Sequence, residues 1–134
     1  MYYNDNGHLV IRKNTIEQIY YEEADYYFGD EDYKEYWGEC DITEEDVTEW
    51  RQFLEEFDIL GRKFLVNEDF YYGQTYMFVI QRKSDEKKFG IQYFYGGGKY
   101  GASMFREEIN DDYETYSFKP VEPFVIQGYR YERD

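Results

Sequence analysis

The chain of 134 residues has one cysteine, Cys40, and one histidine, His8, and both shortages restrict its function. A single cysteine excludes an intramolecular disulfide and is typical of a reducing compartment, so we expect a cytoplasmic protein. Catalytic arrangements of a nucleophile, a base and an orienting group need several such residues to converge. The spacing does not pair His8 with Cys40, and we therefore expect no enzymatic activity.

Long apolar runs and linker-like tracts are also lacking. No segment approaches the roughly 20 apolar residues of a membrane-spanning helix, and the first residues lack the basic and apolar regions of a signal peptide. Only two prolines are present, and no tract rich in serine, glycine or proline separates two domains. At this length we expect residues 1–134 to form a single domain.

Acidic residues, in contrast, are abundant and unevenly distributed. The chain has 30 of them against 15 basic residues, which gives a net charge of −15. Seventeen acids lie between Glu17 and Asp58, where only Lys34 and Arg51 oppose them, while thirteen acids and thirteen bases cancel elsewhere. Such charge repels phosphate backbones and anionic membranes, so we expect no direct binding to nucleic acid or lipid. A basic protein is the expected partner.

Aromatic residues supply the apolar area that a core needs. Eighteen tyrosines, eleven phenylalanines and two tryptophans argue against disorder despite the high charge. Tyrosines that alternate with carboxylates, such as Tyr33 and Tyr36, fit a contact surface, because tyrosine is enriched at binding hot spots and carboxylates pair with a partner's arginine and lysine. The alternative is that the acidic residues serve only solubility.

The clearest helix is expected over Glu44–Leu60. Thr43 and Asp46 have the spacing of a capping box, and Gly61 supplies a stop. The inward face is expected to comprise Val47, Trp50, Phe53, Leu54, Phe57 and Leu60. The opposite face would then form a ridge about 16 Å long, at about 1.5 Å rise per residue. The residues of this ridge are Glu45, Glu49, Gln52 and Glu56.

An earlier helix is expected from Ile16 to about Phe28, because Thr15 and Gln18 have capping-box spacing. An acidic and aromatic connector, residues 29–38, follows it without a clear period. After Gly61 the sequence becomes β-branched and aromatic, which predicts five strands. They are expected over Phe64–Val66, Thr75–Arg82, Lys88–Tyr95, Glu114–Lys119 and Phe124–Tyr131.

These elements predict an α+β fold. The turn Ser84–Lys87 should join Tyr76–Ile80 to Phe89–Tyr93 as an antiparallel hairpin. We expect acidic N-terminal helices packed on one face of a C-terminal antiparallel meander of four to five strands. Residues 1–61 would be the acidic, mainly helical half, and residues 62–134 the near-neutral, mainly β half.

Two motifs that suggest ligands do not match their patterns. Asp30–Asp32 with Asp41 does not form a calcium loop, because Lys34 and Glu35 occupy a ligand position and the glycine position. The glycine-rich segment Gly96–Gly101 lacks the spacing of a phosphate loop, and it is either a hairpin tip or a finger that inserts into a partner. We expect no metal and no cofactor, with a divalent site of another kind as the alternative.

In its size, its acidic segment and its mixture of tyrosine with aspartate and glutamate, the chain resembles small acidic anti-defence proteins of phages and mobile elements. These include anti-CRISPR and anti-restriction proteins that imitate nucleic acid. The resemblance implies a non-enzymatic inhibitor that binds the basic nucleic-acid-binding groove of a nuclease or CRISPR effector, in the host cytoplasm if a phage encodes it. The residues expected to bind the partner are Glu22, Asp25, Asp30, Glu31, Asp32, Tyr33, Tyr36, Glu45, Glu49 and Glu56.

Three alternatives remain open at this point. An immunity protein against a nuclease toxin would use the same acidic surface. A carboxylate-based metal-binding protein or enzyme would use Asp30–Asp41. An adaptor would bind through an exposed β edge, with charge playing no part. The sequence does not identify the target, the inhibited step, the oligomeric state, or a contribution of Gly96–Gly101 or the β edge to binding.

Overall fold

Seven antiparallel strands form one sheet in the computed structural model, which describes residues 1–16, 43–69, 73–95 and 109–131. The strands are β1 (Tyr2–Tyr3), β2 (Leu9–Arg12), β3 (Phe57–Asp69), β4 (Gly73–Arg82), β5 (Lys88–Tyr95), β6 (Thr115–Pro120) and β7 (Arg130–Tyr131). The helices with described bounds are α3 (Glu44–Glu56) and α4 (Pro123–Gln127). The α+β class is confirmed, whereas the sheet exceeds the four to five strands expected.

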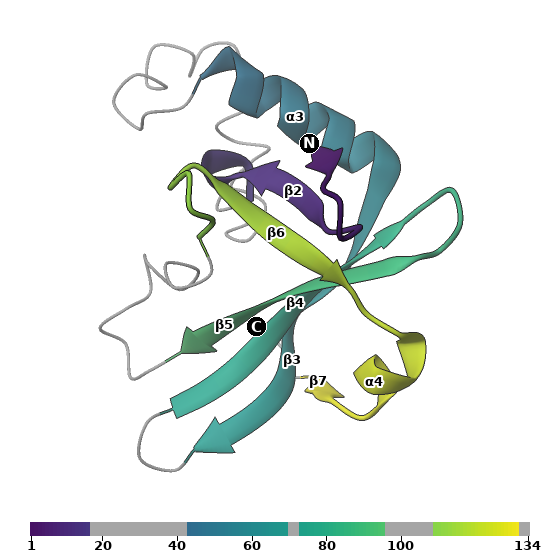
Figure 1. Ribbon diagram of the computed structural model, residues 1–134. Helices are drawn as coiled ribbons and strands as arrows, with labels where there is room; N and C mark the ends of the chain where they lie inside the picture. The colour runs from purple at the N-terminus through teal and green to yellow at the C-terminus, as the bar shows by residue number, and fades with distance from the viewer. Residues whose placement is uncertain (17–42, 70–72, 96–108, 132–134) are drawn as a thin grey trace, which may run out of the picture.

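The sheet order is β1-β2-β6-β5-β4-β3-β7 (Figure 1). Strands β3 to β6 form the expected meander, and β7 adds to β3 at its edge. Strand β2 pairs with β6 although the two lie at opposite ends of the sequence. The described residues of the N-terminal half, 1–16 and 43–61, therefore supply two strands and the beginning of a third, which the expected helical half did not include.

The hairpin of β4 and β5 forms the centre of the sheet, in the register that the sequence predicts. Tyr76 lies opposite Tyr93 and Ile80 lies opposite Phe89. Strand β4 is buried on both faces, because Phe78 packs toward α3 while Val79 packs toward α4. The uninterrupted apolar run of β4 reflects this double burial.

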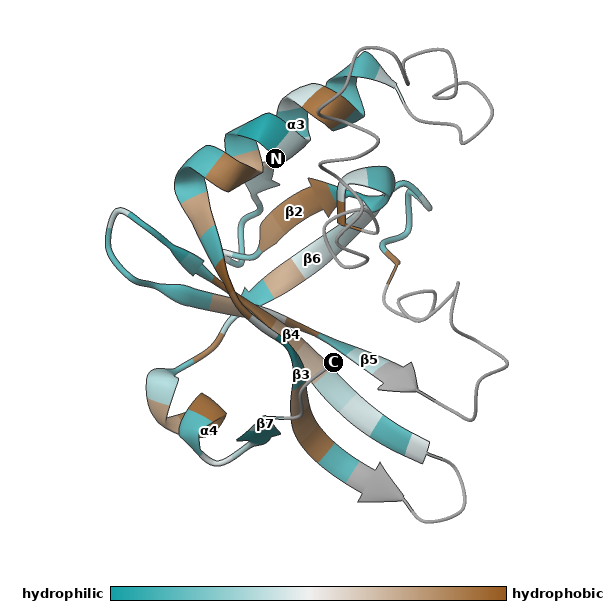
Figure 2. Ribbon diagram, turned by 180° about the vertical axis from the view of Figure 1, so that it is seen from behind, coloured by the Kyte–Doolittle hydropathy of each residue, from teal (hydrophilic) through white to brown (hydrophobic). Residues whose placement is uncertain are grey.

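Two apolar cores lie on opposite faces of the sheet, and Figure 2 shows the apolar positions of β2, β4 and α3. The larger core joins α3 to the sheet. Its buried members are Leu9, Ile11, Ile16, Val47, Trp50, Phe53, Phe57, Tyr76, Phe78, Ile80, Phe89, Ile91, Tyr93, Tyr116 and Phe118. The smaller core contains Met77, Val79 and Ile126, and it places α4 on the opposite face.

Helix α3 ends earlier than expected, at Glu56 rather than Leu60. Phe57 is already extended, with φ −131° and ψ 149°, and its N–H donates to the carbonyl of Phe53. Its ring packs against Phe53 and Phe89 at centroid distances of 5.4 and 6.2 Å. The helix therefore continues directly into β3, because burying Phe57 and pairing with β4 outweigh the local helical pattern.

Gly61 lies within β3 and does not stop the helix, contrary to expectation. A Cβ atom on it would lie 2.5 Å from Cε2 of Tyr131 and 2.7 Å from Cε2 of Phe64. The glycine thus allows two rings to approach the backbone.

Strand β3 is the irregular edge of the meander. Its register against β4 shifts at three places, between Ile59 and Gly61, between Gly61 and Phe64, and between Leu65 and Asn67. On its other side β7 pairs only with Phe64 and Leu65. Most of the outer edge of β3 consequently has no neighbouring strand among the described residues.

The prediction of a final strand over Phe124–Tyr131 is wrong. Pro123 begins the short helix α4, where its missing N–H is not needed, and only Arg130–Tyr131 forms a strand. Ile126 is buried while Phe124 is exposed. The single turn of α4 places the side chain of Ile126 in the smaller core. The alternating pattern of a strand does not predict this position.

The earlier helix begins before the expected residue. Residues 13–16 are already helical, so Thr15 does not cap the helix. Thr15 is buried instead, and its hydroxyl donates to the carbonyl of Asp46 at 3.2 Å. The rest of this predicted helix and the connector lie outside the described residues.

Candidate functional site

Three of the ten residues expected to bind a partner lie on α3, and the structure describes their surroundings. These are Glu45, Glu49 and Glu56. The other seven lie outside the described residues: Glu22, Asp25, Asp30, Glu31, Asp32, Tyr33 and Tyr36. The described part of the candidate site is therefore the set of carboxylates on α3.

The start of α3 is fixed by the capping box that the sequence predicts. The hydroxyl of Thr43 accepts the N–H of Asp46 at 3.3 Å, and Oδ2 of Asp46 accepts the N–H of Thr43 at 2.9 Å. Each residue thus satisfies a backbone donor that the helix leaves unpaired.

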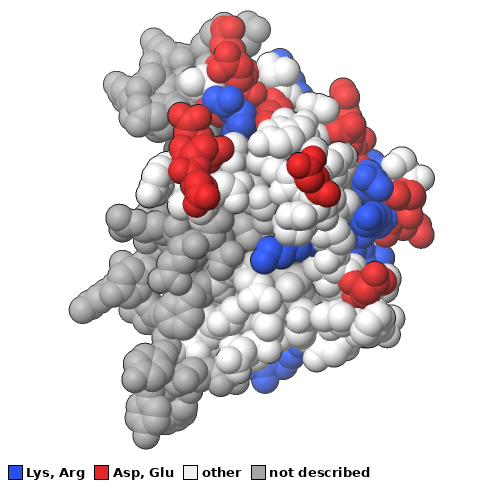
Figure 3. Space-filling view, viewed as in Figure 1, with Lys and Arg blue, Asp and Glu red and all other residues white. Residues whose placement is uncertain are grey.

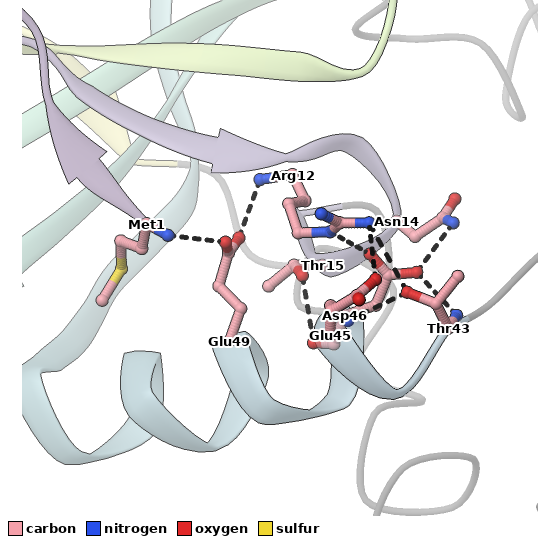
Figure 4. A network of polar contacts seen from close by, with 8 residues as sticks. All are labelled: Met1, Arg12, Asn14, Thr15, Thr43, Glu45, Asp46 and Glu49. Atoms are coloured by element: carbon pink, nitrogen blue, oxygen red, sulfur yellow. Dashed lines mark hydrogen bonds and ion pairs between the residues drawn. The ribbon is translucent and has the colours of Figure 1, made fainter.

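Asp46 also attaches the helix to the segment around β2 (Figure 4). Its carboxylate accepts hydrogen bonds from Nε of Arg12 at 2.6 Å and from Nδ2 of Asn14 at 3.0 Å. The side chain is almost completely buried, with 2% of its surface exposed. A buried carboxylate needs such partners, so Asp46 serves the fold and is not available to a partner protein.

The electrostatics of Asp46 agree with this role. Burial by itself acts to raise the pKa of Asp46, but hydrogen bonds from Arg12, Thr43 and Asn14 outweigh burial and hold the pKa below its ordinary value. The hydrogen bond to Asp46 is in turn the main reason that the pKa of Arg12 is raised. The pair is charged across the neutral range.

Glu49 faces the sheet, so the prediction that it belongs to an exposed ridge is wrong. Its side chain is 6% exposed. Oε2 accepts from the α-amine of Met1, and Oε1 accepts from the backbone N–H of Arg12, both at 2.7 Å. The buried side of α3 follows Asp46, Glu49, Trp50 and Phe53, which share one face at helical spacing. The sequence analysis assigned only apolar residues to that face.

Glu45 and Glu56 are exposed, as expected. Glu45 is 77% exposed and its Oε2 lies 3.7 Å from Nη2 of Arg12, a contact that water screens strongly. Leu54, expected to face the core, is 41% exposed instead. The solvent side of α3 thus combines carboxylates at both ends with an apolar residue near its C-terminal end. The exposed acids of α3 are Glu44, Glu45, Glu55 and Glu56.

The described residues carry only part of the charge excess. Residues 17–42 contain ten acids and one base, Lys34, and lie outside the described residues. On the face drawn in Figure 3, the acidic groups stand apart, several of them beside basic groups. Most of the excess charge therefore belongs to the segment between residues 13–16 and α3.

Metal-ligating residues and surface pockets are the other candidate sites in the described part of the chain. Within that part, no three His, Cys, Asp or Glu residues are grouped as a metal site would require; Asp30–Asp41 lies outside it. No helix there has the length and apolar character needed to cross a membrane. A cavity of about 430 Å³ is lined in part by Asn110 and Asp112, whose side chains bond to Thr115. These bonds hold the loop that leads into β6.

No protein-family model, curated protein or solved structure matches this chain.

Proposed function

We propose that the protein is a non-enzymatic inhibitor that binds the basic nucleic-acid-binding groove of a nuclease or CRISPR effector. The observation that carries the proposal is the concentration of seventeen acids between Glu17 and Asp58, a segment whose charge equals that of the whole chain. Exposed acids lie at both ends of α3, and residues 17–42 contribute ten more acids to the same stretch of sequence. Such a surface competes with nucleic acid for the same basic groove.

The described helix supports the proposal because its backbone is fixed to the sheet. Asp46 and Glu49 attach α3 to Arg12 and Met1, while Trp50 and Phe53 pack into the larger core. A helix whose backbone is already fixed loses little further backbone freedom when it binds. The exposed carboxylates of α3 are the part of the proposed acidic surface that the structure describes.

An immunity protein that neutralises a nuclease toxin is a close variant, because its acidic surface would occupy a basic active-site groove in the same way. A phage-encoded inhibitor would act in the host cytoplasm. A carboxylate-based metal-binding protein or enzyme remains the alternative from another class. Titration with Ca²⁺, Mg²⁺ and Mn²⁺ separates it, since a saturable site would support metal binding.

The first experiment identifies the partner by its response to salt. The immobilised protein is incubated with host lysate at about 0.05 M and 0.5 M salt, where the Debye length differs about threefold. We expect a basic nucleic-acid-binding protein to be captured at low salt and released at high salt. The purified partner should then lose its nucleic acid when the protein is added. Capture that is indifferent to salt would contradict the acidic-surface mechanism.

A charge-matched pair of variants tests the part played by α3. In the first, Glu45→Gln, Glu55→Gln and Glu56→Gln neutralise three exposed acids of the helix. We expect affinity for the partner to fall about tenfold or more at low salt, because close charges across an interface couple strongly. The control has the same net charge but changes acids elsewhere on the surface, namely Asp5→Asn, Asp111→Asn and Glu122→Gln.

The control should bind nearly as tightly as the original chain. Equal weakening of both variants would show that only net charge matters. Full affinity in both would exclude α3 from the interface. Melting temperatures measured alongside should agree among the three proteins, since exposed ion pairs contribute little stability.

A further inference from the structure

Two cavities adjoin on the face of the sheet that points away from α3. Their volumes are about 430 and about 170 Å³, and Ser117 of β6 lines both. Ser117 points to this face because its neighbours Tyr116 and Phe118 are buried in the larger core, and side chains alternate along a strand. Helix α4 packs on the same face, but over Met77 and Val79 of β4. The described helices thus leave this part of the face uncovered.

The smaller cavity exists because β5 and β6 separate. The two strands pair only at Phe89 with Pro120 and at Gly90 with Lys119. The earlier residues of β6 pair with β2 instead, and Figure 1 shows β5 and β6 diverging from the point where they meet. The gap between the two strands is the smaller cavity.

The smaller cavity is lined by side chains with unused hydrogen-bonding groups. Gln92 and Lys119 are exposed, and their side-chain amide and ammonium form no hydrogen bond or ion pair with other described residues. The amide both donates and accepts, and the ammonium donates. A polar ligand can therefore bind these groups without displacing an internal bond.

The larger cavity is walled by a fixed network of amide and hydroxyl groups. Nδ2 of Asn110 donates to Oγ1 of Thr115 at 2.9 Å and to Oγ of Ser117 at 3.0 Å. The Thr115 hydroxyl donates to Oδ2 of Asp112 at 2.8 Å. These oxygens keep lone pairs that can accept from a ligand. Groups held in this way need little reordering when a ligand binds.

An aromatic ring forms another wall of the larger cavity. Tyr2 of β1 lies opposite Val10, which in turn lies opposite Ser117, so the three share one row across the sheet. Tyr2 is 58% exposed, and its hydroxyl forms no hydrogen bond with other described residues. The side chain offers an apolar ring face and a polar tip in the same place.

The lining of the larger cavity restricts the chemistry of a ligand. It contains the carboxylates of Asp111 and Asp112 and no basic residue, so an anion would be repelled. Its apolar lining is limited to Val10, Ile109 and the Tyr2 ring, so an apolar ligand would bury little surface. A hydroxyl group donates and accepts, as do the amides and hydroxyls of the walls. A neutral ligand with many hydroxyl groups therefore fits best.

We propose that this face of the sheet binds a neutral saccharide, with one sugar ring packed on Tyr2 and hydrogen-bonded to the network at Ser117. The larger cavity has the volume of an ordinary ligand site, about 300–1,000 Å³. The smaller cavity adjoins it at Ser117 and offers Gln92 and Lys119 to the hydroxyl groups of a second ring. The inference goes beyond the proposed inhibitor function and does not depend on it, because the site lies on the face opposite α3.

The first test is a titration followed by nuclear magnetic resonance. The isotope-labelled chain is titrated with maltose, cellobiose, lactose and diacetylchitobiose, and with inorganic phosphate as an anion for comparison. We expect at least one disaccharide to bind saturably, with a dissociation constant of about 1 mM or below. The backbone amides of residues 90–92 and 110–119 should shift, while those of α3 should not. Saturable binding of phosphate at the same amides, or no saturable shift with any disaccharide, would overturn the proposal.

The second test uses two matched pairs of variants. Tyr2→Ala and Gln92→Ala remove side chains that line the cavities, whereas Tyr113→Ala and Gln52→Ala remove exposed side chains that do not. We expect each of the first two to weaken binding of the disaccharide about tenfold, and each control to leave it within about twofold. Melting temperatures should stay close to that of the original chain, because all four side chains are exposed. Equal weakening in a variant and its control, or full affinity in both cavity variants, would overturn the proposal.

Discussion

The two sides of helix α3 carry the same chemical groups in opposite environments. On the inward side, Asp46 and Glu49 are buried, and each accepts short hydrogen bonds from cationic groups. On the outward side, Glu45 and Glu56 are exposed, and the ion pair of Glu45 with Arg12 is a long one. The comparison shows that polarity alone does not determine whether a carboxylate on α3 faces the sheet or the solvent. The hydrogen-bond donors that lie opposite the helix also determine it.

The two sets also differ in what their removal would do. A buried carboxylate leaves unpaired donors behind when it is deleted, whereas an exposed one is replaced by water. The inward carboxylates are therefore part of the fold, and the outward ones are accessible to a partner. The following predictions test it, beginning with the largest expected effect.

Replacing Glu49 by alanine should destabilise the protein by about 3–5 kcal/mol, the usual penalty for breaking a buried ion pair. The loss arises because the Met1 amine and the Arg12 N–H are left without an acceptor. Urea unfolding of this variant and of Glu45→Ala measures the loss of unfolding free energy in each. The change at Glu45 should cost less than about 1 kcal/mol. Similar losses in the two variants would contradict the division of α3 into two sides.

Acid should weaken the contribution of Asp46. Because hydrogen bonds hold its pKa below the ordinary value of 3.8, the charged form favours folding above that value, and the stabilisation is lost as the pH falls through the folded-state pKa. Asp46→Asn removes this charge and places an amide donor near Arg12 or Thr43. We expect the variant to be less stable at pH 7, and the difference in unfolding free energy to shrink from pH 5 to pH 2. A constant difference would show that Asp46 acts without its charge.

The capping box gives the smallest expected effect. Thr43→Ala should destabilise the protein by about 1 kcal/mol, because the hydroxyl that accepts the Asp46 N–H is lost. Thr48 lies exposed within the same helix and supplies the matched control. Thr48→Ala should change stability by only a few tenths of a kcal/mol, in the stabilising direction, since alanine is the better helix former. Thermal denaturation of both variants makes the comparison.

Local features of the fold were predictable from the sequence. Thr43 and Asp46 lie three residues apart, and the tight turn at Ser84–Lys87 sets the register of β4 and β5 without help from distant residues. Each partner lies within a few residues of the other or across one short turn. Patterns of this kind can be recognised from the sequence alone, because the residues that form them are close together in the chain.

Non-local features were missed for the opposite reason. The end of α3 depends on Phe57 meeting Phe89 and on pairing with β4, and neither appears in the helical period. Strand β2 finds its neighbour β6 more than a hundred residues away. The sequence pattern predicts a strand over Phe124–Tyr131, although Pro123 starts a helix there whose single buried side chain fits the smaller core.

The candidate site divides in the same way. The exposure of Glu45 and Glu56 follows from their place opposite the apolar stripe, and the sequence showed it. Glu49 is adjacent to Trp50 on the buried side, but its partners are the terminal amine and a backbone N–H of β2. Neither partner has a side-chain signature, so no sequence pattern indicated that this carboxylate would be buried.

The irregular register of β3 has a consequence for how copies of this protein meet. A strand that adds to a sheet edge needs several donors and acceptors in phase, and an exposed regular edge is a template for fibrous aggregation. Three register shifts and Gly61 interrupt β3, so an incoming strand would find matching partners over only a few residues at a time. The irregular register of β3 therefore opposes edge-to-edge pairing between copies of a chain that is rich in tyrosine and phenylalanine.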